Sequence, residues 1–202
     1  MTLAVSLLAC YLIGSVPFSY IFSKMRRGVD PRQAGTGNVG ASNTLLVAGK
    51  VAAVLAVIGD TAKGVCAILL ARYLHLNDWG LVLSALAVVL GHDFSLFLGF
   101  KGGKGVATTG GVLIALDPLF GGIIILLWIL CMLMLRRFIP GTLLTFILVP
   151  LVMWMGSMRT PFILWGIVNA ALALYVHRQD LERFLAGNEL TIQESLAKAL
   201  NK

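Results

Sequence analysis

Charged residues are scarce in this chain. They make up 12% of its 202 residues, whereas a soluble domain of this length has about a quarter. Apolar residues make up 58% of the chain, and the mean hydropathy is +0.91. So little polar surface cannot cover a globule in water, which excludes an ordinary soluble domain. The composition instead predicts an all-α, polytopic integral membrane protein, with residues 1–202 forming a single membrane domain.

Cysteine is rare as well, and it follows no pattern. Cys10, Cys66 and Cys131 lie far apart, each inside an apolar run. Three scattered thiols supply neither a disulfide framework nor the ligand spacing of a metal site. We therefore expect no metal site, and we interpret the cysteines as small residues that face lipid or the protein core.

Six apolar runs approach the roughly 20 residues that a helix needs to cross a bilayer. The first run has no basic segment before it and no small-residue cleavage pattern after it, so we expect no removable signal peptide. A seventh run, Val106–Leu116, is too short to cross comfortably. The six longer runs are Leu3–Phe22, Leu45–Leu74, Trp79–Phe100, Leu119–Leu135, Ile139–Met155 and Pro161–Val176.

Basic residues are concentrated in alternate connections between the apolar runs. The formal net charge is +7, and this placement favours cytoplasmic loops over a nucleic-acid-binding face. The alternation is complete only if Val106–Leu116 also crosses. It then predicts seven crossings, one of them short or broken, with the N-terminus outside and the C-terminus inside. The basic connections hold Lys24, Arg26, Arg27 and Arg32; Lys101 and Lys104; Arg136 and Arg137; and, in the C-terminal tail, Arg178, Arg183, Lys198 and Lys202.

Three unusual polar segments interrupt the apolar sequence: Asp30–Thr44, Gly99–Gly111 and His177–Arg183. The predicted topology places all three at the cytoplasmic face. Loops that only connect spans would not need so many glycines. Their convergence on one side is the strongest indication of a functional site in the sequence.

The first polar segment contains Gly35, Gly37 and Gly40 in a G-x-G-x-x-G pattern. This is not a dinucleotide-binding fingerprint, because that pattern must follow a β-strand and open a helix of a βαβ unit. The glycines still allow backbone N–H groups to surround an anion at a helix N-terminus. The alternative is a flexible loop with a helix N-cap at Ser42 or Asn43. Side-chain donors are supplied by Thr36, Asn38, Ser42 and Asn43.

The second polar segment places Lys101 and Lys104 among Gly102, Gly103 and Gly105. It is not a Walker A loop, because glycine follows the Gly-Lys pair and the glycine spacing differs. Two lysines on a glycine-rich backbone at a membrane surface suit a phosphate or an anionic lipid headgroup. The alternative is ordinary headgroup anchoring, worth about 1 kcal/mol per basic residue.

Polar residues also occur inside two predicted spans. Asp60 and Lys63 are three residues apart, so they can pair on one helix, and we expect a structural ion pair or groups facing an interior cavity. His92 and Asp93 lie late in the third span, near its inner end. A lone histidine there is more often a hydrogen-bonded packing residue than a ligand.

The third polar segment follows the last span. His177, Asp180 and, approximately, Arg183 share one helical face, and Arg178 lies beside them. A histidine among basic groups can give a proton to a phosphate-bearing substrate or take one from it. The alternative is a solvated juxtamembrane helix with anchoring arginines.

Taken together, DPR…GTGNVGASN, GHDFSLFLGFKGGKGVATTGG and HRQDLERF resemble the three motifs of the bacterial acyl-phosphate:glycerol-3-phosphate acyltransferases, the PlsY family. The resemblance covers nearly the whole chain. It implies transfer of a fatty acyl group from acyl phosphate to the 1-hydroxyl of sn-glycerol 3-phosphate, giving lysophosphatidate and inorganic phosphate. It implies no cofactor and no acyl-CoA, and a bacterial inner membrane with the site facing the cytoplasm. The expected partners are the bilayer and an acyl-phosphate-producing enzyme. The protein is expected to be a monomer and to bind no nucleic acid.

The resemblance also assigns roles to individual residues. Many relatives have arginine where Leu46 stands, and asparagine is usual where Asp180 stands, so Asp180 would repel an anionic substrate unless it is paired or turned away. The expected catalytic residues are His177, Lys104, Asn43 and Ser42. The expected phosphate- or substrate-binding residues are Thr36, Gly37, Asn38, Gly40, Lys101, Gly102, Gly103, Gly105, His92, Arg178, Asp180 and Arg183, with Asp60 and Lys63 as structural charges.

Two other classes of membrane protein remain open at this point. A transporter or channel for a small phosphate compound would use similar basic glycine loops and a broken helix. It should also show polar features on both sides of the membrane, or an internal repeat, and the sequence has neither. A structural scaffold would leave the three glycine-rich and polar segments unexplained.

Overall fold

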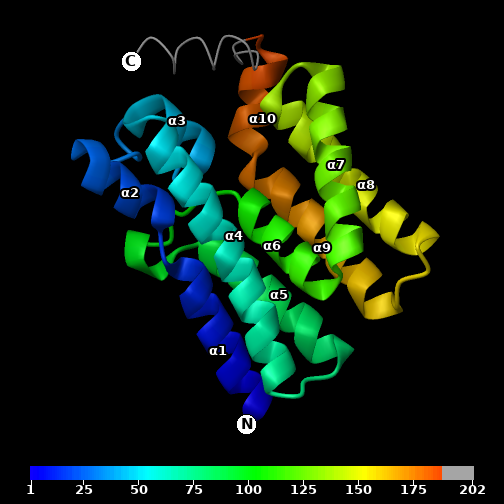
Figure 1. The fold of residues 1–202 in the computed structure, drawn as a ribbon. Coiled ribbons are helices and arrows are strands. Elements are labelled where there is room, and N and C mark those ends of the chain that lie inside the picture. Colours follow the sequence, from blue (N-terminus) through cyan, green and yellow to red (C-terminus); the bar gives the residue numbers. More distant parts are fainter. Residues whose placement is uncertain (188–202) are drawn as a thin grey trace.

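The structure is a computed structural model that describes residues 1–187, all of whose regular elements are helices (Figure 1). The predicted all-α architecture is therefore confirmed for these residues, whereas Lys198 and Lys202 lie outside them. The elements are α1 (Thr2–Ser15), α2 (Phe18–Arg27), α3 (Ala41–Ala48), α4 (Lys50–Tyr73), α5 (Asp78–Asp93), the 3-10 helix η1 (Leu96–Leu98), α6 (Val106–Leu116), α7 (Pro118–Leu135), α8 (Phe138–Met155), α9 (Thr160–Val176) and α10 (Arg178–Leu185).

Five helical segments are long and apolar enough to cross a membrane, or up to six if the bent pair α9 and α10 counts as one span. The first of them, Thr2–Arg27, combines α1 and α2. The short run that the sequence indicated becomes α6, with the bounds that the sequence predicted, but its 11 residues fall below the length of a full span. Length and composition therefore support five or six spans.

Two predicted spans are interrupted where the backbone demands it. The expected helix Leu3–Phe22 breaks between α1 and α2, because Pro17 has no N–H with which to continue the helical hydrogen bonds. The expected run Leu45–Leu74 breaks at Gly49, whose φ of 87° lies outside the range of a right-handed helix. The two predicted spans are nevertheless confirmed as candidates, as Thr2–Arg27 and Lys50–Tyr73; the sequence missed only the breaks.

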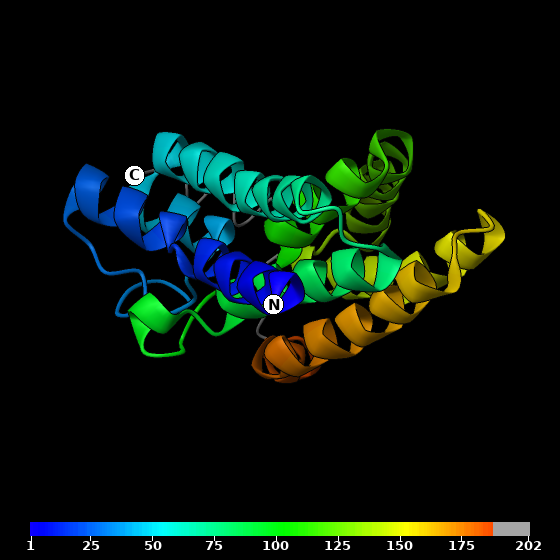
Figure 2. The same cartoon turned by 90° about the horizontal axis from the view of Figure 1, so that it is seen from below.

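Close helix contacts are made through glycine, as is common in membrane bundles. A Cβ atom added to Gly14 of α1 would lie 2.1 Å from the carbonyl oxygen of Val88 on α5. A Cβ added to Gly111 of α6 would lie 2.0 Å from the carbonyl oxygen of Thr61 on α4. Only glycine allows these backbones to approach so closely. Figure 2 shows the resulting bundle, with α4 and α9 on opposite sides and α5 between them.

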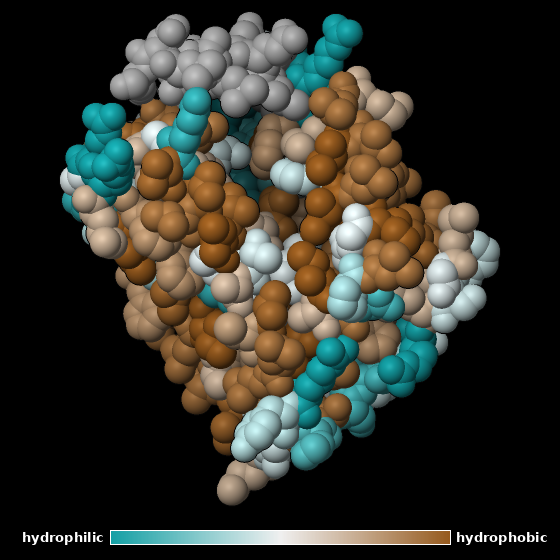
Figure 3. All heavy atoms as spheres, in the orientation of Figure 1, coloured by the Kyte–Doolittle hydropathy of each residue, from teal (hydrophilic) through white to brown (hydrophobic). Residues whose placement is uncertain are grey.

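Hydrophobic side chains cover the middle of the molecule, and hydrophilic ones gather toward its ends (Figure 3). Many large apolar side chains are exposed on the helix surfaces, as expected for residues that face lipid. Helices α3 and α10 and the turn between α7 and α8 lie at one end of the bundle (Figure 1). The N-terminus and the turn between α4 and α5 lie at the other end. The three polar segments thus lie near the end of the bundle that carries α3 and α10.

Candidate active site

Asn43 organises the first polar segment. Its side chain is buried in α3, where its Oδ1 accepts the N–H of Thr36 at 2.8 Å. Its Nδ2 donates to the carbonyl oxygens of Pro31 at 2.8 Å, Ala34 at 3.0 Å and Asn38 at 2.9 Å. These four contacts fold the loop around one amide group. Asn43 therefore positions the loop, and its catalytic role stays a prediction.

The helix that follows this loop begins at Ala41, with Gly40 as its N-cap and no side-chain capping hydrogen bond. The alternative N-cap at Ser42 or Asn43 was wrong, because Asn43 is drawn back into the loop by the contacts above. Ser42 is exposed. At the start of the loop, hydrogen bonds from Arg32 to the Asp30 carboxylate lower the pKa of Asp30.

The second polar segment is fixed to the end of α5 by two backbone hydrogen bonds. The N–H of Gly102 donates to the carbonyl oxygen of Asp93, and the N–H of Gly103 donates to that of His92, each at 3.0 Å. A Cβ on Gly102 would lie 1.9 Å from the His92 carbonyl oxygen, and one on Gly103 would lie 2.1 Å from His92 Nε2. The glycines therefore serve close packing against α5, and the chain is rigidly held where Lys101 and Lys104 project.

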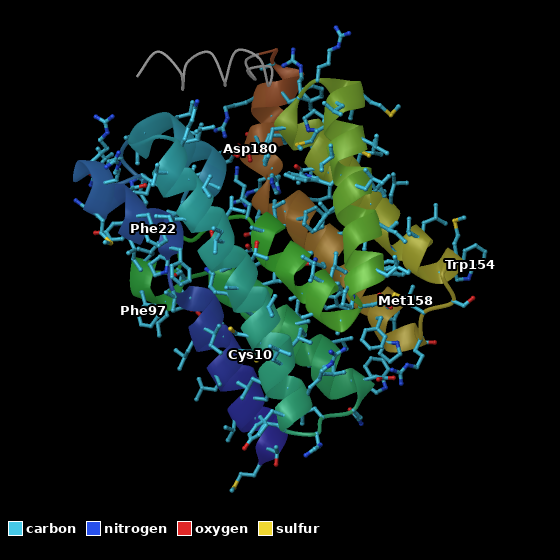
Figure 4. The ribbon with its side chains drawn as sticks, in the orientation of Figure 1. Cys10, Phe22, Phe97, Trp154, Met158 and Asp180 are labelled. Carbon is cyan, nitrogen blue, oxygen red and sulfur yellow. The ribbon has the colours of Figure 1, made fainter. Side chains whose placement is uncertain are left out.

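Lys104 and Arg183 both form ion pairs with Asp180, which lies on α10. The Asp180 carboxylate is buried, and Figure 4 shows it on the side of α10 nearest α3. The repulsion of an anionic substrate that Asp180 would otherwise cause is thus reduced, because two cations neutralise it. This is the paired arrangement that the sequence left open.

His177 ends α9 and is almost completely buried. Its Nδ1 lies 2.8 Å from the carbonyl oxygen of Ala173. Since a carbonyl can only accept, Nδ1 carries the proton, which leaves Nε2 as the proton acceptor of the neutral ring. The Lys104 ammonium interacts electrostatically with this ring. His177 is therefore held in one tautomer beside Lys104.

The three polar segments meet at a cavity of about 270 Å³. Figure 3 shows hydrophilic residues in a hollow near the top of the visible face. The predicted convergence of the three segments is therefore seen in the structure. The lining residues are Thr36, Gly37 and Asn38 from the first; Lys101, Gly102, Gly103 and Lys104 from the second; Arg178, Gln179, Asp180 and Arg183 from the third; and Asp93, Phe94, Tyr175 and Val176 from the ends of α5 and α9.

Several predicted site residues do not line this cavity: Gly40, Ser42, Asn43, His92, Gly105 and His177. Arg178 lines it, although its guanidinium also stacks 4.4 Å from the Tyr175 ring centroid. Sequence reasoning missed Asp93, Phe94, Tyr175 and Gln179. The adjacency of Asp93 to His92 was the one signal for it. Among residues 1–187, no group of three or more His, Cys, Asp or Glu side chains could hold a metal ion.

A buried group of charged side chains lies behind the second polar segment, which packs against His92. Lys63 and Asp60 form the predicted ion pair, with Nζ and Oδ1 2.8 Å apart. Lys63 also donates to the carbonyl oxygens of Gly14 and Val16, at 3.0 and 2.8 Å. Its Nζ lies 3.1 Å from His92 Nδ1. Lys63 therefore caps the end of α1 and braces the histidine against which Gly103 packs.

A family model for glycerol-3-phosphate acyltransferase matches residues 4–187. This chain belongs to the glycerol-3-phosphate acyltransferase family. A relative of that name from Syntrophomonas wolfei is 38% identical over 194 residues, covering 95% of this chain and 97% of the relative. One from Dechloromonas aromatica is 41% identical over 195 residues, covering 95% and 97%. The resemblance that the three motifs indicated is therefore confirmed.

Solved structures of the family have the same fold as this chain. A crystal structure of PlsY, an integral membrane glycerol 3-phosphate acyltransferase, in its glycerol 3-phosphate form has a TM-score of 0.89 and 35% identity. The match covers 95% of this chain and 96% of the PlsY chain. The lysophosphatidic acid form of PlsY has a TM-score of 0.88 and 34% identity, covering 97% and 99%. The present chain is accordingly a multi-pass integral membrane protein.

Proposed function

We propose that this chain transfers a fatty acyl group from acyl phosphate to the 1-hydroxyl of sn-glycerol 3-phosphate. The products are lysophosphatidate and inorganic phosphate. Family membership makes the chain a glycerol-3-phosphate acyltransferase and decides against the transporter and scaffold alternatives. The observation that carries the finer proposal is the cavity where Lys101, Lys104 and Arg183 converge, because both substrates present phosphate groups.

The chemistry asks the protein for positioning and charge stabilisation. The glycerol 1-oxygen forms a bond to the acyl carbonyl carbon, and the bond from that carbon to the phosphate oxygen breaks. Acyl phosphate is already activated, so the ammonium of Lys104 mainly stabilises the charge that develops on the phosphoryl oxygens. The hydroxyl proton goes to Nε2 of His177 or to a substrate phosphate oxygen. Direct attack needs no acyl-enzyme intermediate and no cofactor.

The same proposal includes a topology of seven crossings in a bacterial inner membrane. The supporting observation is the distribution of basic residues: α10 and the Arg136–Arg137 turn share one end of the bundle, and the N-terminus lies at the other (Figure 1). Helix α6 then counts as a short crossing whose polar end faces protein, as membrane interiors require. The active site faces the cytoplasm, where an acyl-phosphate-producing enzyme would supply the donor to a monomeric, single-domain protein.

The donor is tested by comparing two acyl compounds on the purified protein. Incubation with glycerol 3-phosphate and either palmitoyl phosphate or palmitoyl-CoA is followed by mass spectrometry of lysophosphatidate. We expect product from palmitoyl phosphate only, because the basic lining of the cavity suits a phosphate leaving group. Turnover with palmitoyl-CoA in the absence of palmitoyl phosphate, at a rate comparable to that with palmitoyl phosphate, would overturn the choice of donor but not the family.

A further inference from the structure

Asp93, the last residue of α5, contributes a buried carboxyl group to the active-site cavity. The residue is 5% exposed, and its Oδ1 has no hydrogen-bond partner among the described residues. Its position against Gly105 is tight, because a Cβ there would lie 3.0 Å from Oδ1. Oδ1 is sealed within the protein, and among the described residues no hydrogen bond reaches the other carboxyl oxygen, Oδ2, either. A buried carboxyl group without a protein donor is costly, so a donor in the cavity can stabilise it at Oδ2.

The neighbouring cations do not supply that donor. Lys104 is paired with Asp180, and the hydrogen bonds of Lys63 go to the end of α1. The two acidic residues that line the cavity therefore differ in their partners. Asp180 pairs with two cations, whereas Asp93 has a carboxyl oxygen without a partner.

Only one of the two substrates can satisfy such an acceptor. The acyl chain and the carbonyl of acyl phosphate carry no hydrogen-bond donor, whereas glycerol 3-phosphate carries two hydroxyl groups. The 1-hydroxyl must present its oxygen to the acyl carbonyl. The 2-hydroxyl takes no part in bond formation and needs a fixed partner, because otherwise it could compete for the same carbonyl.

We infer that the carboxyl group of Asp93 accepts a hydrogen bond from the 2-hydroxyl of glycerol 3-phosphate and so selects the 1-hydroxyl for acylation. This assignment rests on the proposed function. Asp93 is then a specificity-determining residue for the glycerol moiety. A site that binds a hydroxyl discriminates strongly against an analogue that lacks it, because the acceptor is then left unsatisfied.

The test compares glycerol 3-phosphate with 3-hydroxypropyl phosphate, which keeps the reactive hydroxyl and the phosphate but lacks the 2-hydroxyl. Phosphate release from palmitoyl phosphate is measured for the wild type, Asp93→Ala and Asp93→Asn. We expect the wild type to prefer glycerol 3-phosphate in kcat/KM by at least ~10-fold, because the analogue leaves a buried acceptor unsatisfied. In Asp93→Ala the preference falls to within about 3-fold, and in Asp93→Asn it is intermediate, because an amide oxygen accepts more weakly.

Asp78→Asn is the matched control, since it makes the same substitution at the other end of α5, where Asp78 pairs with Arg159. Its preference should equal that of the wild type. A purely structural role for Asp93 would lower kcat/KM for both acceptors equally and leave the preference unchanged, which overturns the inference. If Asp93→Ala does not fold, Asp93→Asn alone decides by the same ratio. Absence of turnover by the wild type would instead overturn the proposed function.

Discussion

Lys104 is the residue whose two interpretations differ most in their consequences. As a headgroup anchor it would contribute only membrane affinity, whereas in the cavity it pairs with Asp180 and can reach a substrate phosphate. Its side chain is largely buried and lies between Gly103 and Gly105, where the backbone approaches α5 closely. A cation in such a partly dry site interacts more strongly with a developing negative charge than one in water.

We predict that Lys104→Ala lowers kcat at least ~100-fold, because loss of one transition-state charge contact costs about 3–4 kcal/mol. Lys104→Arg should recover part of the rate, since the charge remains while the compact ammonium becomes a planar fork. Lys24→Ala removes an exposed lysine of α2 and should stay within a few-fold of the wild type. A Lys104→Ala rate that matches the Lys24→Ala rate would make Lys104 an anchor.

Asn43 gives a second prediction, because its contacts predict a structural effect. Asn43→Ala leaves the N–H of Thr36 and three carbonyl groups without their partner. Each unsatisfied buried group costs about 1–3 kcal/mol. We therefore expect the free energy of unfolding in detergent to fall by at least ~2 kcal/mol, together with loss of activity. Asn77→Ala removes one N-cap bond on α5 and should cost only about 1 kcal/mol. Equal losses would contradict the role of Asn43 as the centre of the loop.

At the scale of single residues, the sequence predicted which segments meet, but not what each residue contacts there. Glycine and donor density identified the three segments, and the cavity brings them together. Whether Asn43 turns toward substrate or back into its loop depends on the loop conformation, which composition does not determine. The unsatisfied state of Asp93 is equally invisible in the sequence, because it depends on how the surrounding side chains pack.

For the helices, too, the sequence predicted contacts within one element but not contacts between elements. The spacing of Asp60 and Lys63 predicted their ion pair, because residues three apart on a helix are neighbours. It could not predict that Lys63 also caps α1 or touches His92 on α5, since those contacts come from other helices. The breaks at Pro17 and Gly49 were missed because hydropathy alone runs smoothly through both residues.

The cap on α1 predicts that Lys63→Met is strongly destabilising. Removing one partner leaves the Asp60 charge uncompensated in the bundle interior, which costs about 3–5 kcal/mol. The double variant Asp60→Asn, Lys63→Met should recover part of this loss, because no isolated charge remains. Lys50→Met, an exposed substitution on the same helix, should change stability by less than ~0.5 kcal/mol. Unfolding in mixed micelles followed by circular dichroism measures all three, and equal stability of the two single variants would refute the cap.

The crossing of α6 is tested by cysteine labelling in right-side-out and inverted vesicles. Cys66 is the exposed cysteine of the described residues and is first replaced by alanine, whereas Cys10 and Cys131 are buried. Single cysteines at positions 117 and 101 should then label from opposite sides, because α6 separates them. Labelling of both from the same side would reduce the seven proposed crossings to six and contradict the proposed placement of the basic loops.

For the whole molecule, the account joins a membrane fold to chemistry at one end of its bundle. The long helices provide an apolar belt for the bilayer, and the breaks near Pro17 and Gly49 let polar loops reach the ends of α5 and α9. This placement suits one substrate that arrives from lipid and another that arrives from water. The family fixes the reaction class, and the cavity brings together the cations to which we assign phosphate binding, Lys101, Lys104 and Arg183.

The most direct test of the central claim measures phosphate release and lysophosphatidate together. The purified protein is mixed with palmitoyl phosphate and sn-glycerol 3-phosphate, each alone and in combination. The account predicts that phosphate and lysophosphatidate appear in equal amounts only when both substrates are present, and that Lys104→Ala loses both. Phosphate release that does not depend on glycerol 3-phosphate, or release without lysophosphatidate, would contradict the account.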